Sequence, residues 1–181
     1  MARQCFAELG YEATTNRTVA NEAGITTGAM YHYFDSKLGI YTAVLDDVQE
    51  RVYHRFGTAE RSADTFVEKL RAVFEVAHQL NRSDASLAQF LGASRIDRRR
   101  IPELTAALGA GDIQRDGFFE AIVDHGISTG EIRKADRAAM LSYIRAFSIG
   151  LTDGLSNDHR EHRQALDGFM LVLEGRIAKA K

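Results

Sequence analysis

Tryptophan is absent from this sequence of 181 residues, and cysteine and proline occur once each. The single cysteine, Cys5, cannot form an internal disulfide, and the first thirty residues show no basic start followed by an apolar signal core, so we expect a cytoplasmic protein. No run approaches the roughly 18 consecutive apolar residues of a membrane helix. The single proline, Pro102, disfavours a β-rich chain. The 23 basic and 25 acidic side chains nearly balance, which gives no indication of a nucleic-acid partner.

Apolar residues recur at steps of three and four along nearly the whole chain, and sustained alternation with a period of two is missing. This pattern predicts an all-α fold. The predicted helices are 40–56 after the capping residue Asp35, 66–80, a segment around 87–91, a short helix from Pro102, one opened by Asp112, one capped by Asp136 that extends to Leu155, and a last one that reaches Ile177.

The last two predicted helices carry more apolar surface than a single core contact requires. In the first of them a stripe through Ile144 and Leu151 is broadened by Ala139, Tyr143, Ala146, Ile149 and Gly150. In the second, Leu171 and Val172 fall outside the main stripe. The extra surface favours a partner, most simply a second copy of the chain. The alternative is that both helices are buried within one chain.

Residues 16–35 read NRTVANEAGITTGAMYHYFD, a pattern that predicts two short helices joined by a tight turn. Gly24 falls just past the first helix, where the backbone needs a positive φ. Thr26 offers a hydroxyl that can cap the second helix. The residues expected to pack between the two helices are Val19, Ala23, Ile25 and Met30. The arrangement is typical of a helix-turn-helix, whose second helix enters the DNA major groove.

The stretch from residue 6 to 45 closely resembles the amino-terminal domain of the tetracycline-repressor-like (TetR) family of bacterial transcription regulators. The matching residues are Phe6, Gly10, Tyr11, Thr14 and Thr15 before the motif, Ala20, Ala23 and Gly24 within it, and Gly28, Tyr31, Tyr33, Phe34 and Lys37 after it. Further along, Gly130–Arg133 and the helix that follows resemble the start of the family's dimerisation region.

The resemblance implies an all-α homodimer. An N-terminal three-helix helix-turn-helix DNA-binding domain, residues 1–45, would precede a larger helical ligand-binding and dimerisation domain, residues 46–181. The implied function is a ligand-responsive transcriptional repressor that binds a palindromic operator in double-stranded DNA and is released by a small apolar molecule. Ligand would favour a dimer whose recognition helices are wrongly spaced for consecutive major grooves, roughly 34 Å apart.

The predicted DNA contacts lie at the starts of the two motif helices. Thr15 and Asn16 can meet a phosphate with hydroxyl, amide and backbone N–H groups, and Arg17 can reach backbone or base. Thr27 is expected to hydrogen-bond a base edge, and Ala29 to contact a thymine methyl group. The complete predicted set is Thr15, Asn16, Arg17, Thr26, Thr27, Gly28, Ala29, Tyr31, His32 and Lys37.

The predicted DNA interface carries little positive charge. Residues 1–45 carry three basic and four acidic side chains, so phosphate attraction is expected to be small. Lys37 opposes the dipole of the helix that it starts, which an external phosphate would explain. Family members carry further, often basic, residues before the first helix, so this helix is expected to be short. The alternative function is therefore a helical small-molecule sensor or interaction protein with impaired DNA binding.

Several residues have simpler interpretations. Tyr33 and Phe34 are expected in the core rather than against DNA. Thr14 or Thr15 can serve only as a helix cap, and His32 can simply be solvated. The run Arg98–Arg100 is interpreted as a solvated helix end, with contact to DNA or an anionic ligand as the alternative.

The middle helices are expected to enclose an apolar pocket, as the resemblance and their aromatic content indicate. The predicted lining is Phe74, Phe90, Leu91, Phe118, Ile122, Tyr143 and Phe147, with Gln89 or His78 as polar anchors. His159 and His162 are three residues apart but lack a cysteine or carboxylate cluster of recognised spacing, so we expect no metal site. Cys5 has no paired base, and no cofactor motif occurs, so we expect no enzyme.

Overall fold

A computed structural model of the chain describes residues 1–107 and 109–176, and from 109 to 116 the backbone alone. Every regular element within these residues is helical, which confirms the predicted all-α fold. None of the helices in this part is long and apolar enough to cross a membrane. The elements are α1 (Ala2–Ala13), α2 (Asn16–Ala23), α3 (Thr27–Tyr31), α4 (Lys37–Glu60), α5 (Phe66–Ser83), α6 (Ala85–Arg100), α7 (Pro102–Ala107), α8 (Gly109–Ser128), a 3₁₀ turn (Lys134–Asp136), α9 (Arg137–Gly154) and α10 (His159–Leu173).

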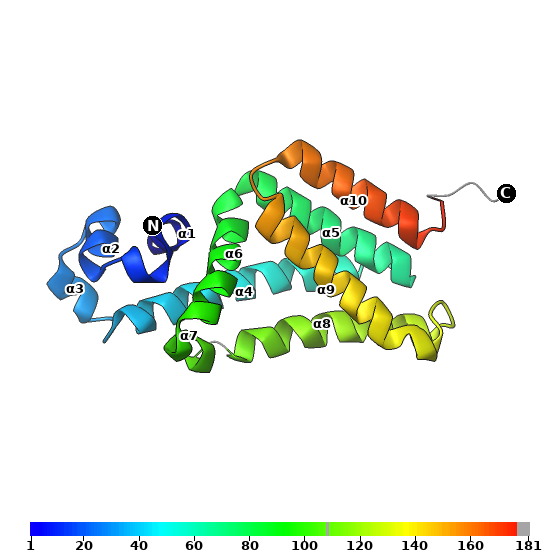
Figure 1. The fold of residues 1–181 in the computed structure, drawn as a ribbon, viewed down its shortest axis with the longest axis horizontal. Coiled ribbons are helices and arrows are strands. Elements are labelled where there is room, and N and C mark those ends of the chain that lie inside the picture. The colour runs from blue at the N-terminus through cyan, green and yellow to red at the C-terminus, as the bar shows by residue number, and fades with distance from the viewer. Residues whose placement is uncertain (108, 177–181) are drawn as a thin grey trace.

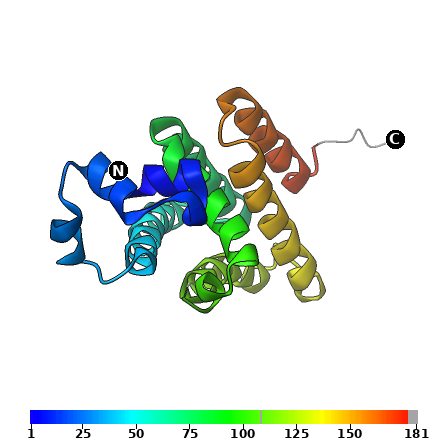
Figure 2. The same cartoon turned by 60° about the vertical axis from the view of Figure 1, so that its left-hand side comes forward.

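The helices form a small head, α1–α3, and a larger body, α5–α10, which are joined by the long helix α4 (Figure 1). α6 stands across α4 where head and body meet, and α1 packs against both α4 and α6. Figure 2 shows α9 and α10 on the side of the body away from α2 and α3. The boundary proposed between residues 45 and 46 falls inside α4, which continues from Lys37 to Glu60.

Two of the predicted helix caps are wrong. α4 is capped by Ser36, whose hydroxyl accepts a hydrogen bond at 3.0 Å from the N–H group three residues on, and not by Asp35. Asp136 precedes α9 as expected, but its side chain makes no capping hydrogen bond. The 3₁₀ turn gives this residue a helical backbone, whereas a capping side chain needs an extended one. Its carboxylate instead accepts a hydrogen bond from Arg133 at 2.6 Å.

The ends of three other helices also follow local chemistry. α7 begins at Pro102, as predicted for a residue that lacks an N–H group. α8 begins at Gly109 rather than at Asp112. α10 is capped by Asp158, whose carboxylate accepts hydrogen bonds from two N–H groups at 2.9 and 3.0 Å, and it ends at Leu173. Ile177, which the sequence places on this helix, lies outside the described residues.

Two aromatic groups organise the core. The first joins head and body, because the ring of Tyr41 lies 4.8 Å from that of Phe6 and 5.3 Å from that of Phe90, between centroids. All three side chains are fully buried. In the second, Phe74 of α5 contacts rings from α8, α9 and α10, namely Phe119, Phe147 and Phe169. Buried aromatic surface of this kind stabilises the contacts among α1, α4 and α6 as well as the packing of the helices within the body.

α5 and α8 approach closely at Gly126, where a side chain would be crowded. A Cβ atom there would lie 3.0 Å from the Cβ of Phe66 and 3.0 Å from the Cδ1 of Ile132. The Glu131 carboxylate accepts hydrogen bonds from the Phe66 N–H at 2.9 and 3.1 Å. The turn that follows α8 is therefore fixed against the start of α5.

Candidate DNA-binding surface and ligand cavity

The turn between α2 and α3 has the predicted geometry. Gly24 adopts a left-handed backbone with φ of +68°, and the N–H of Ile25 donates to the carbonyl of Ala20 at 3.0 Å. The Thr26 hydroxyl accepts a hydrogen bond from the Ala29 N–H at 3.1 Å, which confirms it as the cap of α3. These two local interactions fix the direction in which α3 leaves the turn.

The packing between α2 and α3 differs from the prediction at one residue. Val19 and Met30 are buried as expected, together with Ala20. Ile25, expected to pack between the helices, is 44% exposed. It lies between the left-handed Gly24 and the cap Thr26, in the connection that runs over the surface, and the contact between the helices closes without it.

The structure places nine of the ten predicted DNA contacts on α2, α3 and the residues that flank them, and the tenth, Lys37, at the start of α4. Seven are exposed and three, Asn16, Thr27 and Lys37, are half-buried. The Asn16 amide donates to the Tyr31 hydroxyl at 2.8 Å, so this contact holds the start of α2 against the end of α3. Thr15 is the cap of α2 and accepts a hydrogen bond from the Thr18 N–H at 3.0 Å. Its role as a cap does not remove it from the exposed surface.

Lys37 has a partner within the protein. Its ammonium group donates to the carbonyl oxygens of Tyr11 at 2.8 Å and Glu12 at 3.3 Å, and lies 4.3 Å from the centre of the Tyr11 ring. The carbonyls at the end of α1 therefore explain a cation at this position, and no external phosphate is needed to explain it. The argument that singled out Lys37 from the sequence is wrong, while its contact with DNA stays a prediction.

Tyr33 contradicts the expectation that it belongs to the core. Its side chain is 77% exposed and its ring meets that of His32 at 5.3 Å between centroids. Phe34, the neighbour in sequence, is half-buried against the core as expected. α3 ends at Tyr31, so Tyr33 does not continue the apolar helical stripe that the sequence suggested and is not buried. Together Tyr31, His32 and Tyr33 present exposed polar-tipped rings at the end of α3.

A cavity of about 150 Å³ lies within the body. Its lining comes from α4, α5, α6, α8, α9 and α10. The apolar part of the wall includes Leu45, Val52, Phe56, Phe74, Leu91, Phe119 and Leu151. The charged groups in the described lining are Arg95, Arg98, Arg145 and Glu120.

Two of the nine predicted pocket residues, Phe74 and Leu91, line this cavity as the described residues define it. Phe90 lies instead in the aromatic group between head and body. Gln89 donates to the Asn157 side chain at 2.6 Å. The remaining predicted residues pack elsewhere in the body: Ile122 is fully buried, Phe118 lies on the rings of Tyr53 and Phe56, and Tyr143 and Phe147 stack on Phe169.

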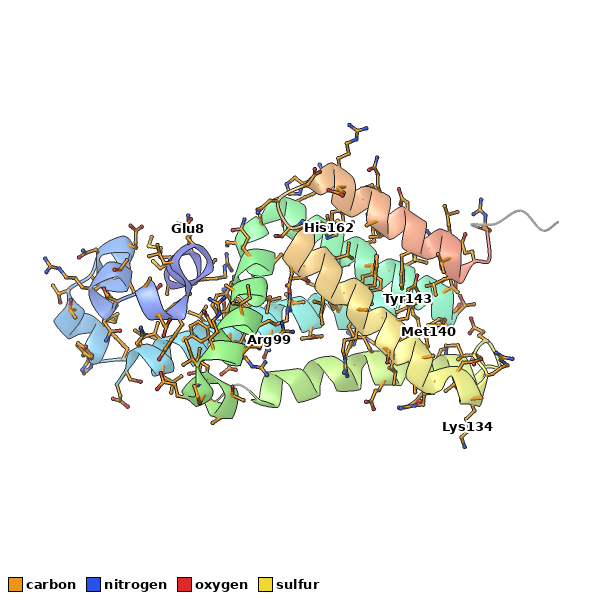
Figure 3. The ribbon with its side chains drawn as sticks, in the orientation of Figure 1. Glu8, Arg99, Lys134, Met140, Tyr143 and His162 are labelled. Atoms are coloured by element: carbon orange, nitrogen blue, oxygen red, sulfur yellow. The ribbon has the colours of Figure 1, made fainter. Side chains whose placement is uncertain are left out.

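His78 reaches the cavity indirectly, through His162. The Nδ1 atoms of the two buried rings lie 3.1 Å apart, and His162 is part of the lining. Burial and the neighbouring His78 lower the pKa of His162 to about 4, and burial together with Arg163 lowers the pKa of His78. Both rings are therefore neutral at pH 7, and one donates a hydrogen bond to the other. Figure 3 labels His162 near the start of α10.

α6 also holds the head. The Asp97 carboxylate accepts hydrogen bonds from the Tyr11 N–H at 2.9 Å and from the Tyr41 hydroxyl at 3.2 Å. Burial and the neighbouring Asp97 raise the pKa of Tyr41, and burial with the Glu103 carboxylate raises the pKa of Tyr11 to about 12. Both phenols therefore remain neutral donors. The same helix thus contacts the ligand cavity and the first helix of the head.

Comparison with known proteins agrees with this geometry. The model of the family described as bacterial regulatory proteins, tetR family, matches residues 1–44. The HTH-type transcriptional repressor KstR2 of Mycolicibacterium smegmatis is 36% identical over 74 residues, which are 41% of this chain and 36% of that protein. Over these residues the chain is similar to the TetR family of bacterial regulators. The aligned part covers little more than a third of the length of this curated relative.

Solved structures show that the TetR likeness of the fold extends beyond the head. The fatty acid degradation regulator FadR of Bacillus halodurans has a TM-score of 0.81 at 18% identity and covers 98% of this chain and 96% of its own. The transcriptional regulator FadR of Bacillus subtilis, solved in complex with stearoyl-CoA, has a TM-score of 0.77 at 20% identity and covers 98% and 96%. These likenesses show that head and body together share the fold of these two regulators.

Sequence reasoning did not assign the arginines to this cavity. Arg98 was interpreted as part of a solvated helix end, with DNA or an anionic ligand as the alternative, and Arg95 and Arg145 were not singled out. A signal was available, because Leu91, Arg95 and Arg98 follow at steps of four and three and so share one face of a helix.

Within the described residues, no group of three or more His, Cys, Asp or Glu side chains is arranged to hold a metal ion.

Proposed function

We propose that the chain is a ligand-responsive transcriptional repressor of the cytoplasm that binds a palindromic operator as a homodimer. A DNA-binding domain, residues 1–45, is joined to a ligand-binding and dimerisation domain, residues 46–181. The observation that carries the proposal is the start of α3, Thr26–Ala29, which is exposed except for the half-buried Thr27 and belongs to a head that is packed on the helix lining the cavity. Each half of the proposal is argued below from the contacts that support it.

Recognition of the operator would depend on the exposed residues of α2, α3 and their flanks. Thr27 begins α3, where its hydroxyl can reach a base edge, and Gly28 and Ala29 allow close approach to the groove. Arg17 is exposed on α2 and supplies a charge for a phosphate. Tyr31 and Tyr33, 50% and 77% exposed, can donate hydroxyl groups to the backbone on either side.

The proposed dimerisation depends on an exposed, mostly apolar face of α9. Ala139, Tyr143, Ala146 and Gly150 follow at steps of four, three and four, and all four are exposed in the single chain. On α10, Leu171 and Val172 are 37% and 41% exposed. Figure 3 shows Met140 and Tyr143 on successive turns of α9. Small residues along a helix allow a second helix to approach closely, and a two-fold axis would pair this face with itself.

The release of operator DNA when a ligand binds would depend on α6. This helix lines the cavity with Leu91, Arg95 and Arg98, and holds the head through Asp97. A ligand that prefers one position of α6 therefore also selects one position of the head, and hence one spacing of the two α3 helices. Weakening operator binding about a hundredfold needs roughly 2.7 kcal/mol of coupling. The FadR structure with stearoyl-CoA supports ligand binding in a body of this fold.

One observation favours the alternative, a small-molecule sensor with impaired DNA binding. Of the three basic residues in 1–45, Arg3 pairs with Asp84 of the body and Lys37 with the carbonyls at the end of α1. Arg17 is the exposed one of the three. The head therefore offers little charge for phosphates, and its affinity would depend on neutral hydrogen-bonding groups.

The test is binding of the purified protein to DNA from upstream of its own gene, measured by fluorescence anisotropy across a salt series. We expect a sequence preference at low salt. Thr27→Ala should change the preference among sites by about 1–3 kcal/mol, whereas Arg17→Ala should weaken all sites and reduce the salt slope by about 1. Arg61→Ala, an exposed arginine after α4, is the control and should change neither.

The result against the proposal is equal affinity for specific and unrelated DNA at every salt concentration, which would favour the sensor. Lys37→Ala separates the two roles of that lysine. If the side chain only closes α1, the variant loses thermal stability while the operator preference of the remaining folded protein is unchanged.

A further inference from the structure

The cavity of the body has a cationic side. Of the four charged residues in its described lining, three are arginines, Arg95 and Arg98 of α6 and Arg145 of α9. Glu120 is the carboxylate among them, and it accepts a hydrogen bond from Arg137, which is itself outside that lining. The described wall therefore carries an excess of positive charge beside rings and aliphatic side chains.

The arginines occupy consecutive turns on the cavity faces of two crossing helices. Arg95 and Arg98 are three residues apart on α6, and Leu91, one turn earlier, lines the same wall. On α9, Arg145 is followed by Ser148 and Thr152, which also line the cavity. The arginine-bearing faces of α6 and α9 thus line the same cavity.

The crossing of α6 and α9 is tightly held, which fixes where these groups lie. The Arg95 guanidinium pairs with the Asp153 carboxylate of α9. A Cβ atom on Gly92 would lie 3.2 Å from Asp153 Oδ1, so the two helices approach closely at this point. Arg98 and Arg145 likewise make interactions inside the protein. Arg95 and Arg98 are half-buried and Arg145 is exposed in the single chain, so a ligand would meet guanidinium groups that already make interactions within the protein.

Neutral donors on the same wall are already used. The Ser94 hydroxyl donates to the Leu91 carbonyl at 2.8 Å, Ser148 to Ile144 at 2.7 Å, and Thr152 to Ser148 at 2.8 Å. Their hydrogens are therefore directed into their own helices. The donors with several N–H groups, and with charge, are the arginines, whose planar fork matches a carboxylate in two-point hydrogen bonds.

We propose that the ligand of this cavity is an organic anion, with a small aromatic or aliphatic body against the apolar wall and a carboxylate against Arg98 and Arg145. This inference rests on the proposed ligand-responsive function and narrows the small apolar effector expected from the sequence to a charged one. At about 150 Å³ the cavity resembles in size an engineered apolar cavity that binds benzene, so a phenyl ring with a short acid arm is a suitable probe.

The experiment compares acids with amides of the same shape. Binding of phenylacetate, phenylacetamide, octanoate and octanamide to the full chain is measured by isothermal titration calorimetry in the absence of DNA. We expect each acid to bind at least about tenfold more tightly than its amide, since the pair differ in charge and not in size. Equal affinities, tighter binding of the amides, or no binding of either acid at millimolar concentration would overturn the proposal.

Variants then locate the anion. Arg145→Gln and Arg98→Gln should each reduce the affinity for the acids about tenfold and leave that for the amides unchanged, and Arg145→Lys should restore part of the loss. Arg99→Gln is the matched control, because Arg99 is an exposed arginine on the same helix and lies outside the described lining (Figure 3). If Arg99→Gln weakens the acids as much as the other two, the anion lies outside the cavity and the proposal is wrong.

Melting temperatures of all variants show whether each is folded, and if Arg98→Gln does not fold, Arg145→Gln and Arg145→Lys decide alone. The outcome is separate from that of the operator experiment. A chain that binds DNA but no acid keeps the proposed regulator and loses its anionic ligand. A chain that binds the acids but shows no DNA preference keeps the anion site and loses the repressor.

Discussion

His162 is a histidine that the fold keeps uncharged. Its ring and that of His78 are buried, and their Nδ1 atoms, 3.1 Å apart, can form a hydrogen bond only when at least one of the two nitrogens lacks a proton. Protonation of both rings would place two donors face to face. The positive charge of Arg163, which lowers the pKa of both rings, acts in the same direction.

The pair predicts a loss of stability in mild acid. The unfolded histidine takes up a proton near pH 6.5, whereas folded His162 resists protonation until about pH 4. The unfolded chain therefore binds more protons between these values, and the free energy of unfolding falls as pH decreases from about 6.5 to 4. For this residue the loss amounts to at most about 3 kcal/mol.

Urea unfolding of the wild type and His162→Gln at several pH values between 7.5 and 4.5 measures this effect. Glutamine retains a donor and an acceptor but does not titrate, so the variant should show a flatter pH profile than the wild type. His54→Gln, at an exposed position on α4, serves as the control and should follow the wild type. Parallel profiles for His162→Gln and the wild type would contradict the prediction.

At the scale of the element, α6 is the helix that connects the two parts of the molecule. One face lines the cavity with Leu91, Arg95 and Arg98, while Phe90 and Asp97 face α1 and α4. The carboxylate of Asp97 also lies against Gly10, where a Cβ atom would be 3.4 Å from Oδ1 and where φ is +75°. The irregular end of α1 is thus fitted to this side chain.

Asp97→Ala should detach α1 from α6. The variant leaves the N–H of Tyr11 and the hydroxyl of Tyr41, which is fully buried, without their acceptor, and we expect the free energy of unfolding to fall by about 2–3 kcal/mol. Tyr41→Phe removes one of these donors and should cost about 1 kcal/mol. Hydrogen exchange at the Tyr11 amide should accelerate in Asp97→Ala and change little in Tyr41→Phe.

A double-mutant cycle tests whether the two residues act together. If Asp97→Ala and Tyr41→Phe are strictly additive, the 3.2 Å contact between them contributes nothing and this account of the junction is wrong.

The elements that depend on neighbours in sequence were predictable, and those that depend on distant partners were not. The left-handed Gly24 and the cap Thr26 follow from residues within one turn. Tyr33 and Ile25 could not be placed, because their exposure depends on where the chain leaves a short helix. Lys37 has its partners in α1, and nothing in the local sequence indicates that contact.

The cavity shows the same limit at the candidate site. The sequence does not distinguish the apolar residues of the middle helices that line the cavity from those that face the head. Phe90 faces the head because α1 and α4 pack against α6 at that turn. The TetR resemblance and the aromatic content of these helices predicted an internal pocket and two of its wall residues, Phe74 and Leu91. The arginines required knowledge of both α6 and α9, which meet only in three dimensions.

At the scale of the whole molecule, α9 lies on the side of the body away from α2 and α3 (Figure 2). Its exposed residues Ala139, Tyr143, Ala146 and Gly150 form the face proposed to meet a second chain. If two chains meet there, each head would stand at an outer end of the pair, so the distance between recognition helices would depend on how head and body are joined. The packing of α1 on α6 would then set that distance in both copies.

Ala146→Glu tests this assembly with little cost to the single chain, because the side chain at this position is exposed. A charged group in an apolar contact between copies should raise the dimer dissociation constant at least about a hundredfold. Analytical ultracentrifugation measures the change, and operator affinity should fall with it. Ala121→Glu, at an exposed alanine of α8, is the control. A wild-type chain that is monomeric at micromolar concentration would contradict the assembly.

The contact at Gly126 constrains how proteins of this fold can diversify. Where the end of α8 meets the first residue of α5, an added Cβ atom would require Phe66 and Ile132 to shift by a few tenths of an ångström. We expect homologues that respond to unrelated compounds to retain glycine here while exchanging side chains on α6 and α9. A homologue that replaces this glycine should carry compensating changes at the positions of Phe66 and Ile132.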